Sequence, residues 1–128
     1  MRLLLDTHAF LWMTLDDSQL SQTGRELLSD TGNTLLLSAA SYWEIAIKIS
    51  LGKYSLTEPL DDFVKREVIA NRLTILPISP EHAAVVAHLE FHHKDPFDRL
   101  LAAQAQVEGV AIVSKDEIFD RYGVNRLW

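Results

Sequence analysis

Four acidic residues, far apart in the chain, occupy positions from which carboxylates could bind the same ligand. Asp6 directly follows the first apolar run of the sequence, and Asp116 follows the last long one after a gap of two residues. Asp98 opens a stretch rich in leucine and alanine, which should be buried on most sides if it is helical. Glu44 lies about two turns into the helix that we expect after the second apolar run.

Each of these acids also has an ordinary structural role open to it. Asp6 and Asp116 could cap or begin a helix, and Glu44 is placed to pair with Lys48 at i,i+4. For Asp98, the helix dipole favours an acid in the first turn. Four carboxylates gathered at one edge of a fold, however, repel one another unless a cation lies among them.

The available ligand types indicate which cation this would be. The sequence holds no cysteine, and a site of four carboxylates has no need of histidine. Oxygen ligands favour a hard cation, Mg²⁺ or Mn²⁺, and four carboxylates can hold one or two such ions. Two ions about 3.5–4 Å apart would orient an attacking water and stabilise the leaving oxygen of a phosphodiester. They would also neutralise the acids, so that a phosphate backbone could approach them.

The elements that must position these acids alternate along the chain between apolar runs and helical segments. The predicted strands are Leu3–Leu5, Thr34–Leu37, Leu73–Leu76, Val110–Val113 and, as an edge strand, Val124–Leu127. The predicted helices cover 9–13, 21–29, the segment from the Ser38 cap to Gly52, 59–70, 80 to about 89, 96 to Gly109, and a short helix that starts at a capping box over 114–117.

This alternation predicts an α/β fold with a single domain over residues 1–128. Strands that are apolar throughout, without alternating polarity, are buried on both faces. We therefore expect a parallel sheet of five strands flanked by helices on both faces. The C-terminal ends of parallel strands lie along one edge, where ligands bind in open α/β folds, so the four acids can meet there.

The composition limits the classes of function. The chain has 128 residues, 48% of them hydrophobic, which suits one globular domain. With 18 acidic and 12 basic residues the formal net charge is −6, so binding of nucleic acid through bulk charge is not expected. No apolar run approaches the span of a bilayer, and the lack of cysteine fits the reducing cytoplasm, where we expect the protein.

Four stretches of the sequence together resemble the PIN-domain ribonucleases, in particular the VapC-like toxins of bacterial and archaeal toxin–antitoxin pairs. They follow the order of the family and cover nearly the whole chain. The most specific of them contains Asp-Pro-Phe-Asp-Arg in its leucine- and alanine-rich setting. The matching stretches are Leu4–His8, Ser41–Lys48, His92–Ala105 and Ser114–Asp116.

The resemblance implies a PIN-like fold and a metal-dependent endoribonuclease that hydrolyses phosphodiester bonds of RNA. It assigns the acidic metal site to Asp6, Glu44, Asp98 and Asp116. Asp98 matches the third acid of the family, and Asp95 is an additional acid. The resemblance also implies a homodimer and a small cognate antitoxin that blocks the acidic groove.

Four further side chains adjoin the acids, and each has two interpretations. Thr7 and Ser114 could orient carboxylates or bound water, or cap the start of a helix. Arg99 could hold a scissile phosphate, or pair with a nearby acid such as Asp95. Lys48 could contact RNA, but an i,i+4 ion pair is the simpler prediction.

The histidines and large aromatic residues are expected to have structural roles. Adjacent histidines in a loop are commonly solvent-facing or hydrogen-bonded, and a hard-cation site does not require them. We therefore leave His8, His82, His92 and His93 out of the predicted site. We assign Trp12, Trp43, Phe91 and Phe97 to the core or to a dimer interface.

Two other functions use a similar arrangement of acids. A phospho-accepting signalling module of the receiver type also places acids around Mg²⁺ at the ends of parallel strands. It needs paired acids after the first strand, where this chain has only Asp6, and Glu44 lies inside a predicted helix. A catalytically silent binding protein with the PIN fold would differ from the enzyme only in activity.

Overall fold

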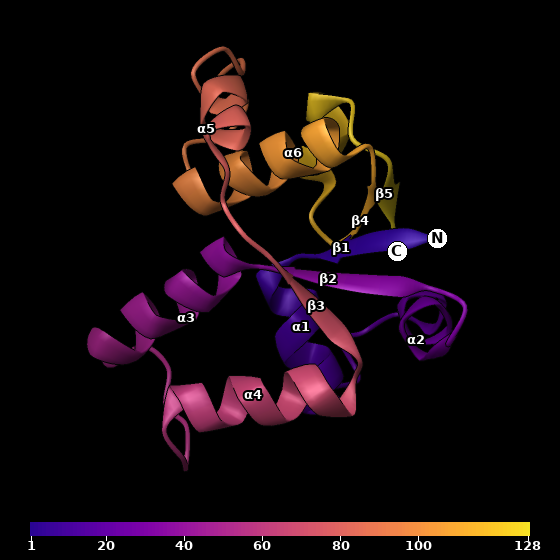
Figure 1. Ribbon diagram of the computed structural model, residues 1–128, viewed down its shortest axis with the longest axis vertical. Helices are drawn as coiled ribbons and strands as arrows, with labels where there is room; N and C mark the ends of the chain where they lie inside the picture. Colours follow the sequence, from indigo (N-terminus) through magenta and orange to yellow (C-terminus); the bar gives the residue numbers. More distant parts are fainter.

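A five-stranded parallel sheet forms the centre of the fold (Figure 1). The computed structural model describes residues 1–128, with strand order β3-β2-β1-β4-β5. The strands are β1 (Arg2–Leu5), β2 (Thr34–Ser38), β3 (Leu73–Leu76), β4 (Ala111–Val113) and β5 (Arg126–Leu127). The helices are α1 (Thr7–Thr14), α2 (Gln22–Ser29), α3 (Ala39–Ser50), α4 (Leu60–Ala70), α5 (Pro80–Val86), α6 (Pro96–Glu108) and the 3₁₀ helix η1 (Glu117–Tyr122). The predicted α/β class and the parallel five-stranded sheet are confirmed.

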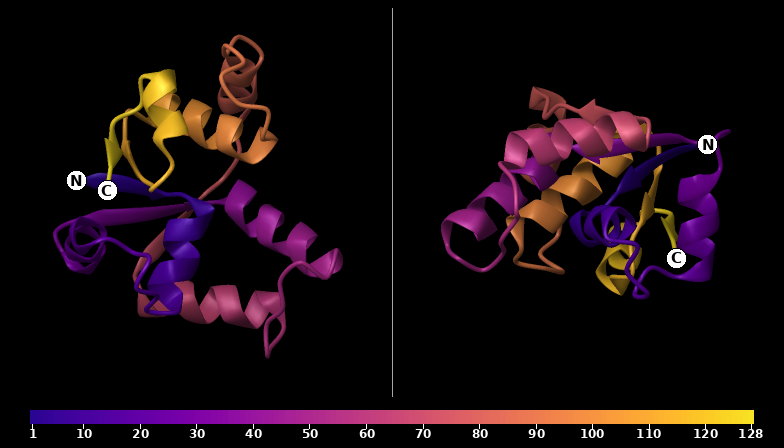
Figure 2. Two further views of the ribbon diagram at one scale, coloured as in Figure 1. Left: turned by 180° about the vertical axis from the view of Figure 1, so that it is seen from behind. Right: turned by 90° about the horizontal axis from the view of Figure 1, so that it is seen from below.

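Helices cover both faces of this sheet, as predicted (Figures 1 and 2). Leu3 and Leu5 of β1 belong to the buried cluster on the side of α1, α3 and α4, which includes Phe10 of α1. Leu4, between them, belongs to the cluster on the opposite side, together with Leu101 of α6. Successive residues of a strand point to opposite faces, so a strand covered on both sides carries leucine at every position.

The strand register brings the ends of the central strands to one edge. Leu5, the last residue of β1, pairs with Leu37 of β2 on one side and with Val113 of β4 on the other. The backbone N–H of Asp6 still donates to the carbonyl of Val113 at 3.1 Å. The segments that follow β1, β2 and β4 therefore start side by side.

Helix α6 begins and ends where the sequence predicts. The Asp95 side chain caps it by accepting from the N–H groups of Phe97 (2.8 Å) and Asp98 (3.2 Å), with Pro96 in the first helical position. Gly109 ends the helix in the left-handed region, with a φ of 64°, which glycine adopts without strain. Asp95 is therefore the cap of α6, and Asp98 falls in the first turn.

Two elements are shorter than predicted. Helix α5 ends at Val86 and does not reach Leu89. The carbonyls of both residues accept from Nη2 of Arg99, at 3.4 and 3.3 Å, so this turn is fixed by a side chain from α6. Strand β5 covers only 126–127, where it pairs with Ile112 and Val113 of β4. None of the helices is long and apolar enough to cross a bilayer.

The last helix also differs from the prediction in its type and in its cap. It is a 3₁₀ helix, and Asp116 caps it by accepting from the N–H of Ile118 at 3.0 Å. The predicted capping box that begins at Ser114 does not form. Instead the Ser114 hydroxyl donates to the carboxylate of Asp6 and accepts from the N–H of Asp116. A tertiary contact has therefore replaced the local one.

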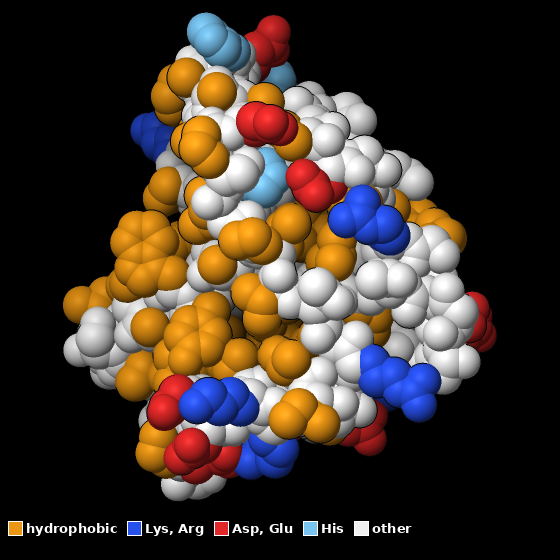
Figure 3. Space-filling view, viewed as in Figure 1, with side chains coloured by type: hydrophobic (Ala, Val, Ile, Leu, Met, Phe, Trp, Pro, Cys, Tyr) orange, Lys and Arg blue, Asp and Glu red, His pale blue; other side chains and the backbone are white.

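Apolar side chains gather on the face of the molecule that Figure 3 shows, over α3, α4 and the edge strand β3. A hollow of about 330 Å³ lies between these three elements. Its lining is mainly apolar and consists of Ala39, Tyr42, Asp61, Val64, Lys65, Val68 and Ile75. Exposed apolar surface of this kind is typical of contact with another protein.

Candidate metal centre

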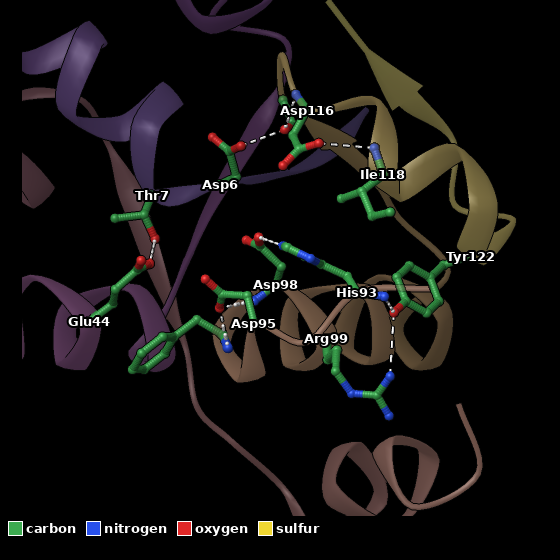
Figure 4. Close-up of polar contacts among 12 residues, drawn as sticks. Asp6, Thr7, Glu44, His93, Asp95, Asp98, Arg99, Asp116, Ile118 and Tyr122 are labelled. Carbon is green, nitrogen blue, oxygen red and sulfur yellow. Dashed lines mark hydrogen bonds and ion pairs between the residues drawn. The ribbon is translucent and has the colours of Figure 1, made fainter. Parts of the chain in front are cut away.

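The four predicted acids all lie at the C-terminal edge of the sheet (Figure 4). Asp6 follows β1, and Asp116 follows β4 and precedes η1. Glu44 lies in the second turn of α3, and Asp98 lies in the first turn of α6. Their side chains come from four separate segments and surround a common space. The fold thus brings together the residues that the sequence singles out.

Two donors hold Asp6 in a buried position. Its Oδ1 accepts from the backbone N–H of Ala9 at 2.7 Å, which caps α1, and its Oδ2 accepts from the hydroxyl of Ser114. Burial is the largest influence on the pKa of Asp6 and raises it above its ordinary value, while the two hydrogen bonds oppose this shift. The negative charge of Asp116 acts in the same direction as burial.

Glu44 is also buried, and two side chains hold its carboxylate. The Thr7 hydroxyl donates to Oε1 at 2.6 Å, and Thr7 forms a second hydrogen bond with Ser41 Oγ at 2.9 Å. Lys48 Nζ lies 3.1 Å from Oε2, so the predicted i,i+4 ion pair is present. Thr7 and Lys48 therefore fix both oxygens of Glu44 on the side of the site nearest α1 and α3.

Asp98 has a single side-chain partner. Its Oδ2 lies 3.0 Å from Nε2 of His93, in the segment before α6. Burial, followed by the negative charges of Asp95 and Glu44, raises the pKa of Asp98 to about 7, although His93 opposes the shift. Without a cation this carboxyl therefore keeps its proton to a higher pH than an ordinary aspartate does.

Asp116 completes the site on its exposed side. Its backbone N–H donates to Ser114 Oγ at 3.0 Å, so Ser114 links Asp116 to Asp6. One carboxylate oxygen of Asp116, one of Asp98 and a ring nitrogen of His93 all lie within 4.8 Å of one another. This is close enough for three ligands of one ion.

The residues present fit a divalent cation. Asp116 raises the pKa of Asp6, and Asp95 and then Glu44 raise that of Asp98, so repulsion acts within two pairs of site acids, Asp6 with Asp116 and Glu44 with Asp98. A divalent ion among them would offset this repulsion, and carboxylate oxygens are the ligands that Mg²⁺ and Mn²⁺ prefer.

Comparison with known proteins identifies the fold. A family model described as the PIN domain matches residues 3–125, nearly the whole chain. The chain belongs to the PIN-domain family. The predicted resemblance to this family is thereby confirmed, and so is the predicted PIN-like fold.

Individual relatives agree with this assignment. The chain is 27% identical to "Ribonuclease VapC22" of Mycobacterium tuberculosis over 114 residues, which cover 88% of this chain and 85% of the relative. It is 42% identical to "Ribonuclease VapC16" of the same organism over 59 residues, which cover 46% of this chain but only 40% of that relative. A solved structure of DNA-bound VapBC from Salmonella typhimurium shares the fold, with a TM-score of 0.73, 19% identity and coverage of 99% of this chain and 97% of that chain.

Arg99 takes neither of its predicted roles in this PIN domain. Its guanidinium is buried and points away from the acids (Figure 4). Nη1 donates to the carbonyl of Glu90 at 2.9 Å and to the hydroxyl of Tyr122 at 3.4 Å. Nη2 donates to the carbonyl of Val86, the last residue of α5, and to that of Leu89, which follows the helix. The ring of Phe91 lies over the guanidinium at 4.0 Å. The prediction of a phosphate ligand is therefore wrong, and Arg99 instead fixes the segment that leads to the site.

His93 is the residue that the sequence analysis set aside and that the structure places at the site. It is hydrogen-bonded, as expected for a loop histidine, but its partner is one of the site acids, Asp98. One feature of the sequence could have identified His93 as a site residue. His93 lies inside the most specific stretch of the PIN-domain resemblance, two residues before the cap of α6.

Proposed function

We propose that this PIN domain is a metal-dependent endoribonuclease that hydrolyses phosphodiester bonds of RNA. Its metal-binding carboxylates are Asp6, Glu44, Asp98 and Asp116. The proposal is carried by the convergence of these four side chains at one edge of the sheet, where burial and mutual repulsion raise the pKa of Asp6 and Asp98. Two relatives that bear the name ribonuclease support the same activity.

The residues of the site have separable roles in this reaction. One or two ions of Mg²⁺ or Mn²⁺, when bound, orient the attacking water and stabilise the leaving oxygen of the phosphodiester. Ser114 holds the carboxylate of Asp6, and Thr7 holds that of Glu44, so these two ligands are in place before the ion arrives. With a net charge of −6, the protein depends on the ions to attract an RNA backbone.

The same proposal includes a biological role as the toxin of a toxin–antitoxin pair. The partners would be a small cognate antitoxin that covers the acidic groove and a second copy of the chain in a homodimer. A VapBC complex whose chain shares this fold supports a protein partner. So does the exposed apolar surface over α3, α4 and β3 (Figure 3).

Cleavage of RNA by the purified chain tests the proposed activity. We expect cleavage of a mixed-sequence RNA with Mg²⁺ or Mn²⁺ and none in EDTA. Asp6→Asn and Asp98→Asn should each lower the rate at least about 100-fold, because the loss of a ligand should exceed the 10–100-fold effect of losing a group that only supports one. Circular dichroism and thermal unfolding would verify that both variants fold.

Asp95→Asn is the matched control. It removes the same charge three residues from Asp98, and asparagine caps a helix as well as aspartate does, so cleavage should persist. Full cleavage in EDTA, or by Asp98→Asn, would contradict the proposal. A folded wild-type chain that cleaves no RNA with either ion would favour a catalytically silent binding protein.

A further inference from the structure

His93 is placed beside the acids by anchors that lie outside the acid cluster. Its backbone N–H donates to the hydroxyl of Tyr122 at 3.1 Å, and this hydroxyl also accepts from Arg99 at 3.4 Å. Both Arg99 and Tyr122 are buried, and the ring of the neighbouring His92 packs edge-on against Tyr122, 5.2 Å away. The fold therefore fixes the backbone of His93 beside the acids.

The distances around His93 are close to those between ligands of a single ion. In an octahedral site with bonds of about 2.1 Å, adjacent ligand atoms lie about 3.0 Å apart and opposite ones about 4.2 Å. Nε2 of His93 lies 3.0 Å from Oδ2 of Asp98. A ring nitrogen of His93, an oxygen of Asp98 and an oxygen of Asp116 all lie within 4.8 Å of one another. An ion could therefore take all three with small side-chain shifts.

We propose that His93 supplies a nitrogen ligand to the ion held by Asp98 and Asp116, and that this ligand makes the site prefer Mn²⁺ to Mg²⁺. The inference rests on the proposed function, which places the ion among these acids. Imidazole nitrogen suits transition-metal ions, whereas Mg²⁺ is satisfied by oxygen. The hydrogen bond between His93 and Asp98 would be replaced by two bonds to the same ion.

The test compares the wild-type chain with His93→Gln and with His92→Gln. His92 is the matched control, because it is adjacent in sequence but contacts Glu90 and Tyr122 and none of the four site acids. Pulsed electron paramagnetic resonance on the Mn²⁺-loaded protein detects a directly bound imidazole nitrogen. A titration that follows the resonance signal of free Mn²⁺ gives the affinity of the protein for Mn²⁺. Displacement of bound Mn²⁺ by added Mg²⁺ gives the affinity for Mg²⁺.

We expect the nitrogen coupling in the wild type and in His92→Gln, and its absence in His93→Gln. The Mn²⁺ affinity of His93→Gln should fall about 10–100-fold, with a much smaller change for Mg²⁺. The wild-type spectrum is decisive even if His93→Gln does not fold. A wild-type spectrum without nitrogen coupling, or equal losses of affinity for both ions, would overturn the proposal.

The outcomes also separate this inference from the proposed function. If the protein cleaves RNA with Mn²⁺ but shows no nitrogen coupling, the ligand role of His93 is wrong and the nuclease stands. If the nitrogen coupling is present but no RNA is cleaved, the ligand assignment stands and the nuclease is wrong. A wild-type chain that binds no Mn²⁺ would overturn both.

Discussion

The two sides of the acidic site are held in different ways. On the inner side, Asp6 and Glu44 are buried, and each carboxylate has two polar partners from the surrounding fold. On the outer side, the carboxylate of Asp98 has only His93, and that of Asp116 is exposed and bonds to an N–H of η1. Each inner carboxylate therefore has two polar partners, and each outer carboxylate has one.

The two sides share a need for a cation but differ in what positions them. Donors that hold a carboxylate keep it in place and offset part of its charge whether or not an ion is bound. This compensation is incomplete on both sides, because the pKa of Asp6 is raised and that of Asp98 is raised to about 7. An ion would balance the remaining negative charge. The segment that carries His93 on the outer side depends on Arg99 for its position.

The largest effect is expected from removing Arg99, which should disorganise the outer side and leave the inner side intact. Arg99→Ala leaves the carbonyls of Val86, Leu89 and Glu90 without their donor. We expect the free energy of unfolding to fall by about 3 kcal/mol, measured by urea denaturation. Arg99→Lys keeps the charge but has no planar fork of donors, so it should recover only part of this loss.

An exposed arginine provides the control for this substitution. Arg66 pairs with Glu58 at the surface, and Arg66→Ala should lower the free energy of unfolding far less than Arg99→Ala does. Equal unfolding midpoints for wild type and Arg99→Ala would show that the segment before α6 does not depend on the guanidinium.

A smaller effect is expected from pH, because of the carboxyl of Asp98. Without metal its pKa in the folded state is about 7, above the ordinary 3.8. The stability that the protonated carboxyl of Asp98 contributes is fully present below pH 3.8 and is lost as the pH rises through 7. In EDTA, the free energy of unfolding of the wild type should therefore decline between about pH 5 and pH 8. In Asp98→Asn this decline should be smaller by about 1–2 kcal/mol, a value that allows for the partial exposure of the carboxyl.

Asp120→Asn is the control for this pH dependence. A hydrogen bond from Arg126 lowers the pKa of Asp120, so its contribution is lost only as the pH falls through more acidic values. The variant should therefore keep the wild-type slope between about pH 5 and pH 8. Parallel curves for wild type and Asp98→Asn in urea titrations at each pH would contradict the repulsion that we assign to the outer side.

The smallest effect is expected on the inner side, at Lys48. The ion pair with Glu44 is partly exposed, and Glu44 keeps its bond from Thr7 when the lysine is removed. Lys48→Gln should lower the free energy of unfolding in EDTA by about 0.5 kcal/mol or less, measured by thermal unfolding. A loss as large as that of Arg99→Ala would mean that the inner side depends on this charge and is not fixed by the fold.

The architecture could be predicted because local patterns encode it. Apolar runs without polar alternation indicate strands that are buried on both faces. Such strands require helices over both faces of the sheet. Asp95, Pro96 and Gly109 mark the ends of α6 through bonds to neighbouring residues, which sequence spacing captures. The four acids could be proposed together because parallel strands end at one edge.

The sequence by itself therefore determined the α/β fold, the PIN-domain resemblance and the four acids, since each depends on short-range pattern or on strand direction. Only the tertiary structure decided the roles of Arg99, Ser114 and His93. The partners of Arg99 lie between 9 and 23 positions away, and Ser114 bonds to Asp6 across 108. A buried polar side chain bonds to whatever donor or acceptor the packing brings within reach, and no local pattern records that choice.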